Sequence, residues 1–496
     1  MKSLGIFLLA GSLCLTVQGQ MLDKTDSRAR TTFNDFIELP GFDMTKMPRQ
    51  QKNLPPGWKA IGTIRPKNAS EVEGPQMITL GCETLCRDYI YWDTYKEYVA
   101  PLGIKRIRLQ GGWAKTEQKP GEYNFAWLDS VIDDARSRGL EVWLETDYGN
   151  PIYPGGGSWD LGAGFPTSPE GLAAWDRWVT ELATRYKGKV RDWAMWNEPD
   201  CGGKTPEMIA LFNIRTAEII KRIIPDARIG ALSLASNNPK LVEACMDVFA
   251  RENKLDLFDW VIYHGYAYNP DTSYKNVMGI LQAVRKYSDK IQLWQGENGA
   301  PSEMARKFAL SDYPWTELTQ AKWDARRILG DLGHDVVSSV FTLCEFDHKG
   351  REINHKGLLK INDKQTLAKV KMAYYTVQNI ASVFDASLTR IPEYACTLEC
   401  ETPLTWYAYR DAKRGCDLVV FWDGTHIPSN DNTPRKATLT LPANAFADPV
   451  FADLISGVLY EIPAEQKRME NGKWVFTDLP CYDAPVLVTE RTKLVE

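Results

Sequence analysis

The stretch DWAMWNEP, residues 192–199, places asparagine, glutamate and proline directly after a short apolar run. A run of this kind predicts a buried strand that ends at a polar loop. A second stretch, LWQGEN at residues 293–298, has the same layout, with Glu297 at the end of its apolar run. Glu198 and Glu297 therefore each stand where a predicted strand meets its loop.

The region around these stretches alternates strand-like runs with amphipathic helical stretches, from Met77 to about Val383. Repeated βα units predict a parallel sheet, and eight units in roughly 300 residues suit a (β/α)8 barrel. An open doubly wound sheet would carry a Gly-rich turn after its first strand, and Gly81-Cys82-Glu83 lacks one. The predicted strands are Met77-Gly81, Lys105-Gln110, Glu141-Asp147, Asp192-Trp196, Arg228-Leu232, Trp260-Tyr266, Ile291-Gly296 and Val336-Leu343. Each is followed by a predicted helix, and the clearest helices are Trp127-Arg138, Glu170-Tyr186, Pro206-Ile224 and Leu318-Leu332.

The pattern changes after Val383 to short, partly alternating runs separated by Gly, Asn, Asp and Pro. This composition predicts an accessory antiparallel β-sandwich domain, to which Trp58-Ile64 could add a strand. The predicted strands are Leu404-Arg410, Asp417-Trp422, Ala437-Leu441, Val458-Ile462 and Pro485-Thr489. The expected organisation is a signal peptide at 1–19, an N-terminal segment at 20–75, the barrel at 76–383 and the β domain at 384–496.

The first residues have the pattern of a targeting segment. Lys2 supplies a positive charge, Leu4 to Val17 is apolar, and Val17-Gln-Gly19 offers small residues for cleavage. No later stretch reaches about 18 continuous apolar residues, so no membrane span is expected. These features predict a secreted or periplasmic protein.

Composition narrows the classes of partner. The net charge is -5 and the 17 Trp and 21 Tyr residues are many, which fits a large core. With no basic excess, nucleic acid is not an expected partner. Nine cysteines remain after Cys14, two pairs of them in C-x3-C spacing, which leaves disulfides unassigned. Neither a metal nor a cofactor is expected, and the oligomeric state cannot be read.

The two glutamates suggest a chemistry because barrel active sites lie at the carboxyl ends of the strands. Glycosidic bond cleavage needs two facing carboxyl groups, one to protonate the leaving oxygen and one to attack or to activate water. Asn197-Glu198-Pro199 after the fourth strand, with Glu297 after the seventh, resembles clan A glycoside hydrolases. Trp196 to Asp200, together with Gly111-Gly-Trp113 and Gly121 to Phe125, is most similar to family 39, which contains β-xylosidases and α-L-iduronidases.

The resemblance implies a retaining enzyme with a carbohydrate substrate. It implies Glu198 as the acid/base and Glu297 as the nucleophile. Asn197 would then bind the sugar hydroxyl next to the anomeric carbon, and Arg108 would keep the nucleophile ionised. His264 and Tyr266, after the sixth strand, occupy positions where the clan has groups that touch the nucleophile.

Further substrate contacts are expected from loops that follow other strands. Trp113, Asp147 and Asn150 follow the second and third strands, and Glu345 follows the eighth, where many clan members have a tryptophan. Tyr148, Trp159 and Trp315 are weaker candidates of the same kind. The charged group after the eighth strand leaves a pentose, a galactoside or a modified sugar open as the substrate.

The resulting hypothesis is a retaining, exo-acting β-glycosidase. Long loops after the third and seventh strands favour a pocket, whereas an endo-acting polysaccharide hydrolase would need an open groove lined with aromatic residues. A non-catalytic glycan-binding protein on a barrel scaffold is the alternative from another class, and the presence of both glutamates argues against it.

Overall fold

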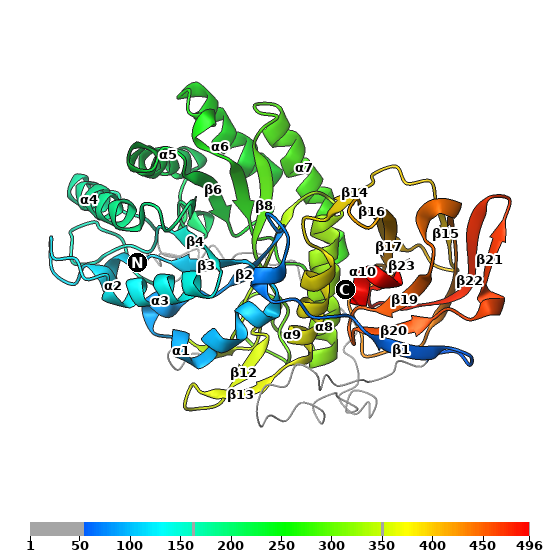
Figure 1. Ribbon diagram of the computed structural model, residues 1–496. Coiled ribbons are helices and arrows are strands. Elements are labelled where there is room, and N and C mark those ends of the chain that lie inside the picture. Colours follow the sequence, from blue (N-terminus) through cyan, green and yellow to red (C-terminus); the bar gives the residue numbers. More distant parts are fainter. Residues whose placement is uncertain (1–53, 161–163, 349–351, 496) are drawn as a thin grey trace, which may run out of the picture.

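A computed structural model of the protein describes residues 54–160, 164–348 and 352–495. The predicted signal peptide, residues 1–19, lies outside the described residues. The chain forms a barrel followed by two antiparallel sheets that lie beside it (Figure 1).

The barrel is closed by eight parallel strands that pair in chain order, as the sequence predicts. The last strand returns to the first, because Ile78 pairs with Ser338. Apolar side chains fill the centre, where the tilted rings of Trp143 and Trp294 pack with centroids 4.3 Å apart. The strands are β2 (Ile78–Gly81), β3 (Arg106–Gln110), β4 (Glu141–Glu145), β5 (Asp192–Ala194), β6 (Arg228–Leu234), β7 (Trp260–Tyr263), β8 (Gln292–Asn298) and β9 (Val337–Val340).

Helices surround the strands and begin at recognisable capping residues. Ser168, Thr205 and Asn238 each accept a backbone N–H bond with the side chain, and each is followed by a proline. Proline suits the first helical position because its missing N–H would have no partner there. The helices are α3 (Ala126–Ser137), α4 (Pro169–Tyr186), α5 (Pro206–Ile223), α6 (Pro239–Arg251), α7 (Tyr274–Arg285), α8 (Glu317–Leu332) and α9 (Met372–Val383).

The first βα unit departs from the prediction of a helix after every strand. Only the four-residue α1 (Trp92–Tyr95) and short 3-10 turns follow β2. The turn at Ala100–Leu102 contains Pro101 and ends at Gly103, which has φ +83°. Proline and a left-handed glycine both interrupt regular helix, so the chain crosses this side of the barrel as separate turns.

The C-terminal region forms a seven-stranded and a four-stranded antiparallel sheet. Strand β1 (Lys59–Thr63), far away in sequence, pairs with β20 and so joins the larger sheet. The larger sheet also contains β14 (Leu388–Arg390), β16 (Thr405–Asp411), β17 (Cys416–Trp422), β19 (Pro449–Asp453), β20 (Val458–Glu461) and β23 (Val486–Glu490), and the smaller sheet contains β15 (Thr397–Glu399), β18 (Arg435–Pro442), β21 (Lys467–Glu470) and β22 (Lys473–Cys481). Every residue of β17 is buried, which shows that both faces of this strand are covered.

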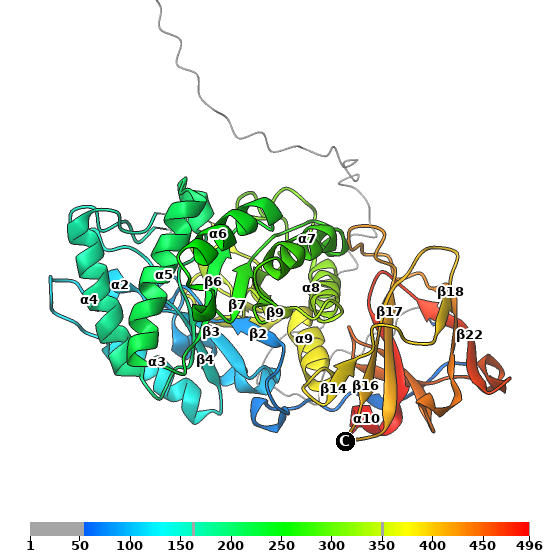
Figure 2. The same ribbon diagram turned by 90° about the horizontal axis from the view of Figure 1, so that it is seen from above.

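Helices α8 and α9 lie between the barrel and the β domain, as two views at right angles show (Figures 1 and 2). All residues of both helices are buried. Short elements complete the chain: α2 (Trp113–Thr116), β10 (Phe346–Asp347), β11 (Ile353–Asn354), β12 (Leu359–Ile361), β13 (Leu367–Val370) and α10 (Arg491–Val495).

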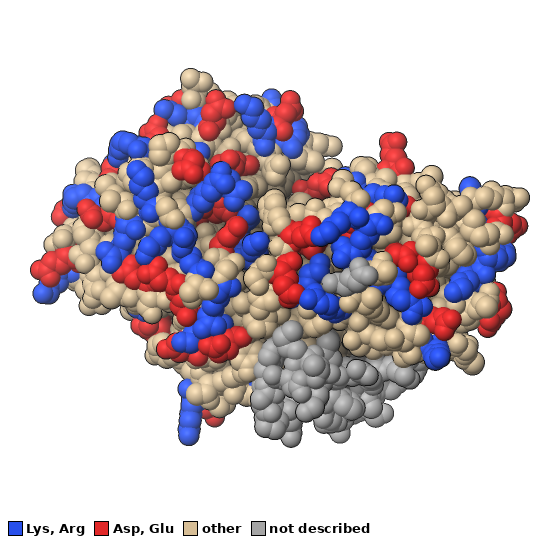
Figure 3. Space-filling view, in the orientation of Figure 1, with Lys and Arg blue, Asp and Glu red and all other residues tan. Residues whose placement is uncertain are grey.

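The surface carries interspersed acidic and basic side chains on the face shown in Figure 3, without a single-sign stripe. Within the described ranges, no helix is both long and apolar enough to cross a membrane. The nine cysteines from Cys82 onward are all free thiols, so neither C-x3-C pair forms a disulfide in this structure.

Candidate active site

Glu198 and Glu297 meet at the barrel mouth because each is placed by the carboxyl end of a strand. Glu198 follows β5, and its backbone has φ +51°, a left-handed conformation that is uncommon for residues other than glycine. Its N–H donates to the carbonyl of Ser233, at 2.9 Å. Ser233 lies in a bulge of β6, where the register shifts between Ala231 and Leu234. The neighbouring strand thus fixes the strained backbone that presents this carboxylate.

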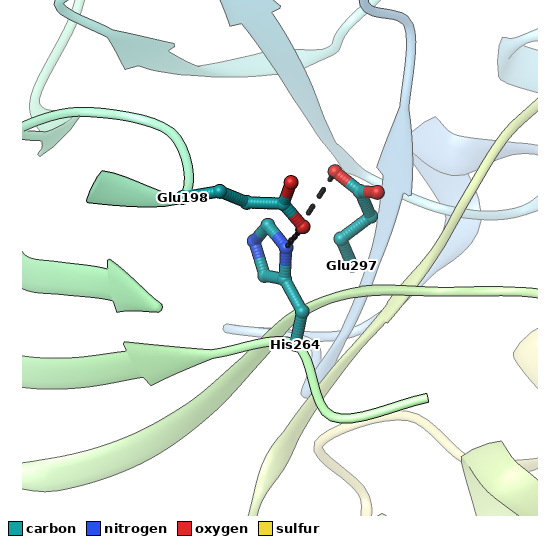
Figure 4. Close-up of side chains that lie close together, drawn as sticks. All are labelled: Glu198, His264 and Glu297. Atoms are coloured by element: carbon teal, nitrogen blue, oxygen red, sulfur yellow. Dashed lines mark hydrogen bonds and ion pairs between the residues drawn. The ribbon is translucent and has the colours of Figure 1, made fainter. Parts of the chain in front are cut away.

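His264, which follows β7, stands between the two carboxylates (Figure 4). Its Nδ1 lies 2.8 Å from Oε1 of Glu198 and 3.8 Å from Oε2 of Glu297. Burial lowers the pKa of His264, but the charges of Glu297 and Glu198 raise it more, so it lies above its ordinary value. The two carboxylates therefore outweigh burial in setting the pKa of this imidazole.

Arg108, in the middle of β3, holds Glu297 from the other side. Its Nη1 donates to Oε2 of Glu297 at 2.7 Å, and Tyr266 donates its hydroxyl to Oε1 at 3.0 Å. Burial raises the pKa of Glu297, but His264 and Arg108 outweigh burial and lower the pKa overall. This carboxylate therefore stays ionised in a largely buried site.

Asn197 is oriented by the same arginine. Its Oδ1 accepts from Nη2 of Arg108 at 2.6 Å, and its Nδ2 donates to the hydroxyl of Tyr148 at 2.8 Å. The amide is thereby fixed next to Glu198 in sequence and beside Glu297 in space. The five residues that the sequence grouped with Glu198, namely Arg108, Asn197, His264, Tyr266 and Glu297, all lie together here.

Two further carboxyl groups belong to this cluster, and the sequence analysis missed both. Glu83 after β2 accepts from Nη1 of Arg108 at 2.7 Å, and Glu145 at the end of β4 accepts from Nη2 at 2.8 Å. Gly81 leaves room for Glu83, since a Cβ at that position would lie 2.3 Å from Oε2 of Glu83. The signal that could have found them is the one used for Glu198 and Glu297, an acid where a barrel strand ends.

The site opens into a cavity of about 540 Å³. Its residues come from the carboxyl ends of all eight barrel strands and from the loops that follow them. Its lining residues are Glu83, Thr84, Arg87, Gln110, Tyr148, Asn197, Glu198, Cys201, Ala235, Ser236, Asn237, Gly265, Tyr266, Glu297, Phe308, Ala309, Phe341, Phe346, His348, Asn354 and Lys356. The side chains of Glu198 and Glu297 remain 18% and 13% exposed, which leaves both accessible to a ligand.

Four predicted substrate contacts do not line this cavity, and the structure corrects them. Trp113 is fully buried against Trp178, because α2 turns its side chain toward α4. The side-chain amide of Asn150 donates to the carbonyl of Glu117, and Glu345 is buried in an ion pair with Lys371 at 2.6 Å. Asp147 is fully buried too, beside Glu145.

The weaker candidates divide in the same way. Tyr148 lines the cavity. Trp315 is buried and donates to the carbonyl of Leu310, and Trp159 is 48% exposed outside the cavity wall.

Two groups of side chains have the residue types of a metal site. Ligand atoms of Glu198, His264 and Glu297 lie within 4.8 Å of one another, and so do those of Glu303, Glu345 and His355. A cation in the first group would face the guanidinium of Arg108, only 2.7 Å from Glu297, and like charges repel at that range. The second group is already neutralised by Lys360 and Lys371.

Comparison with known sequences gives short matches. The family model described as β-galactosidase, glycoside hydrolase 42, matches residues 91–153. A 6-phospho-β-glucosidase of Clostridium longisporum is 27% identical over 134 residues, which cover 24% of this chain. The chain spans about a quarter of that relative, 26% of its length.

Comparison of structures covers most of the chain. A family 39 glycoside hydrolase from Bacteroides cellulosilyticus WH2 superposes with a TM-score of 0.62 at 16% identity, over 87% of this chain and 83% of the other. A monomeric β-xylosidase from Caulobacter crescentus CB15 gives a TM-score of 0.56 at 14% identity, over 87% and 97%. The resemblance to family 39 noted in the sequence is thus confirmed at the level of the fold, a (β/α)8 barrel with an antiparallel β domain.

Proposed function

We propose that the chain is a retaining glycoside hydrolase. The observation that carries this proposal is the spacing of the two acids, since an oxygen of Glu198 lies within 4.8 Å of an oxygen of Glu297. Retaining enzymes hold their carboxyl groups about 5–5.5 Å apart, whereas inverting enzymes leave about 6.5–9.5 Å for a water molecule. The short matches to glycosidase sequences support the same reaction class.

The surroundings of the two acids distinguish their roles. Glu297 accepts hydrogen bonds from Arg108 and Tyr266 and stays ionised, as a nucleophile must. Glu198 is contacted by His264 and is free of the arginine, which suits a group that gives and then takes a proton.

The reaction then proceeds in two displacements. An oxygen of Glu297 bonds to the anomeric carbon while the bond to the leaving oxygen breaks, and Glu198 gives its proton to that oxygen. Glu198, now a carboxylate, takes a proton from water, whose oxygen bonds to the anomeric carbon and releases Glu297. Two inversions give net retention.

An exo-acting β-glycosidase fits the cavity best. The large aromatic side chains that are exposed in the described structure are Tyr91, Trp159 and Tyr268, and none of them lines the cavity. An endo-acting enzyme would place such rings along an open groove to stack on successive sugars. The β-xylosidase among the similar structures supports an exo-acting enzyme but does not name the sugar.

The test is hydrolysis of a panel of aryl glycosides and plant-wall oligosaccharides by wild type, Glu198→Ala and Glu297→Ala. We expect one glycoside to be cleaved with its anomeric configuration retained, read by NMR of the first product. Loss of Glu198 should lower kcat on poor leaving groups by roughly 10²–10⁴-fold, and loss of Glu297 should abolish turnover. Glu122→Ala, at an exposed loop position, is the matched control.

Azide separates the two roles. With Glu297→Ala it should yield the inverted glycosyl azide, and with Glu198→Ala the retained one. An inverted product from the wild type, or full activity of either variant, would refute the mechanism. Binding of a glycan without any hydrolysis would favour the non-catalytic alternative.

We also infer that the protein is exported, to the periplasm or beyond. Support comes from the sequence, where a lysine, an apolar run and small residues occupy positions 1–19. Mass spectrometry of the protein recovered from each cell fraction should find a chain that begins near residue 20 outside the cytoplasm. A full-length chain in the cytoplasm alone would contradict export.

A further inference from the structure

Two cations line the cavity without an anionic partner. Arg87 is 5% exposed, and its Nε and Nη1 have no hydrogen-bond partner. Lys356 is 3% exposed, and no hydrogen bond or ion pair involves its ammonium within the described chain. Both side chains touch aromatic rings, Arg87 on Tyr148 at 4.6 Å and Lys356 on Tyr266 at 5.6 Å. Rings of this kind replace only part of the hydration that a buried charge loses.

The two cations belong to one sector of the barrel mouth. Arg87 follows β2 and Lys356 follows β11, after β9, and β2 pairs with β9. A chain of contacts along the cavity wall connects the two segments: Arg87 lies 5.0 Å from the ring of Tyr89, whose ring lies 5.4 Å from that of His348. His348 in turn lies 3.5 Å from Asn354.

The nearest acids do not neutralise either cation. Asp147 forms no ion pair with Arg87, and burial together with the charge of Glu145 raises its pKa well above the ordinary range, against the lowering effect of Arg108 and Arg87. The charges of Glu297 and Glu352 act on Lys356, but neither carboxylate lies within ion-pair distance of its ammonium, and Glu297 is already bound by Arg108 and Tyr266. A buried unpaired charge destabilises a fold, which makes a structural role a poor explanation for two of them.

The backbone holds Lys356 in place. Its N–H donates to Oδ1 of Asn354 at 3.2 Å, and its carbonyl accepts from Nε2 of Gln320 at 3.1 Å. Gly357 permits the close packing of this segment, because a Cβ there would lie 2.1 Å from the backbone nitrogen of Glu345. The ammonium is therefore presented to the cavity from a fixed wall.

We propose that this sector binds a negatively charged substituent of the substrate sugar, a carboxylate or a sulfate ester. Lys356 and Arg87 would supply the charged donors, and the anion would give each the partner it lacks. This deepens the hydrolase proposal and rests on it for the identity of the ligand as a sugar. It makes the enzyme one for acidic glycans, with the charged group directed toward β2 and β9.

Binding to an inactive enzyme tests this independently of turnover. Calorimetry with Glu297→Gln would compare glucuronate, galacturonate and glucose 6-sulfate with glucose and galactose. We expect at least one acidic sugar to bind tenfold or more tightly than its neutral parent. Whether a uronate or the sulfate binds distinguishes the two sources of charge. Lys356→Met and Arg87→Met in the same background should each remove most of that preference, and Lys364→Met, at an exposed position nearby in the chain, should keep it.

A stability measurement guards against misfolding. Because Lys356→Met removes an unpaired buried charge at nearly constant length, we expect it to raise the melting temperature while it abolishes the preference. The proposed anion site is wrong if no acidic sugar, tested at up to tens of millimolar, binds more tightly than its neutral parent. Absence of any binding in that range counts as the same outcome. A preference that survives both substitutions also overturns it. The hydrolase proposal is judged separately, by whether the wild type turns over any aryl glycoside, neutral or uronic.

Discussion

Arg108 is the side chain on which the charges of the site converge. It binds three carboxyl groups, those of Glu83, Glu145 and Glu297, and it also fixes Asn197. Three buried carboxyl groups share the charge of this arginine, with His264 beside Glu297, and this crowding favours a proton on one of them. Burial, together with the charges of Glu297 and Glu145, raises the pKa of Glu83 to about 7 despite Arg108. The pKa of Glu297, in contrast, is lowered. The network thus keeps the charge on the nucleophile and a proton on its neighbour.

This arrangement predicts how stability depends on pH. The pKa of Glu83 is higher in the folded protein than the usual 4.5, so its contribution to stability is complete below about pH 4.5 and is lost as pH rises through about 7. Glu83→Gln, which cannot ionise, should flatten the decline of the unfolding free energy between pH 5 and 8 by up to about 3 kcal/mol. Urea denaturation at both pH values measures this. A decline equal to that of the wild type would show that Glu83 is ionised throughout.

Sequence position located the acids of the site better than it located the sugar contacts. Asn197, Glu198 and Glu297 follow from strand ends, because the barrel turns every such end toward one mouth. Trp113 and Asn150 also follow strands, yet their side chains turn away from the cavity and both bond to Glu117. The direction of a loop depends on tertiary packing, such as the stack of Trp113 on Trp178, and no local pattern encodes it.

At the scale of elements, the bulge of β6 is the structural feature that positions Glu198. Leu232 and Ser233 have φ +79° and +45°, and the carbonyl of Ser233 accepts the N–H of Glu198. Asn213 on α5 secures the bulge, since its Oδ1 accepts from the N–H of Leu232 at 2.9 Å. The sequence predicted β6 as a regular strand ending at Leu232, because hydrophobic alternation reports burial and is insensitive to a local left-handed backbone.

Asn213→Leu should therefore reduce activity from a distance. The buried N–H of Leu232 loses its partner, which costs about 1–3 kcal/mol of stability. Glu198 is displaced with the bulge, so kcat should fall by roughly 10-fold or more. Thermal melts and kcat measure the two effects. Thr205→Ala, which removes the cap of the same helix, is the matched control: it should cost about 1 kcal/mol and leave kcat unchanged. Equal losses of kcat in both variants would mean that α5 acts only through overall stability.

At the scale of the whole molecule, α8 joins the barrel to the β domain. A helix that is buried on every side needs partners for its charges, and the β domain supplies them. Lys322 donates to Oδ1 of Asp483 at 2.6 Å and to the carbonyls of Ser429 and Asp431. Arg326 bonds Asp271 of the barrel, which also accepts from Nε1 of Trp422 at 2.8 Å. Polar contacts of this density across a buried helix indicate that the two parts unfold together.

Asp483→Ala tests that coupling. Lys322 is fully buried and Asp483 is 5% exposed. Removing the carboxylate leaves the ammonium of Lys322 buried without its partner, which should lower the free energy of unfolding by about 3–5 kcal/mol. Burial raises the pKa of Asp483, but the charge of Lys322 outweighs burial and lowers it overall, so its contribution is present above about pH 4 and lost as pH falls further. The wild type should therefore lose stability in acid more steeply than the variant.

Calorimetry distinguishes coupled from separate unfolding of the barrel and the β domain. In Asp483→Ala we expect one transition at lower temperature, because α8 packs against both parts and neither remains stable once it is exposed. The double variant Lys322→Met/Asp483→Leu should recover much of the loss, since it removes both charges and keeps apolar volume at the interface. Two separate transitions would show that the β domain is an independent attachment. A double variant less stable than the single one would show that packing around Lys322, rather than its charge, maintains the interface.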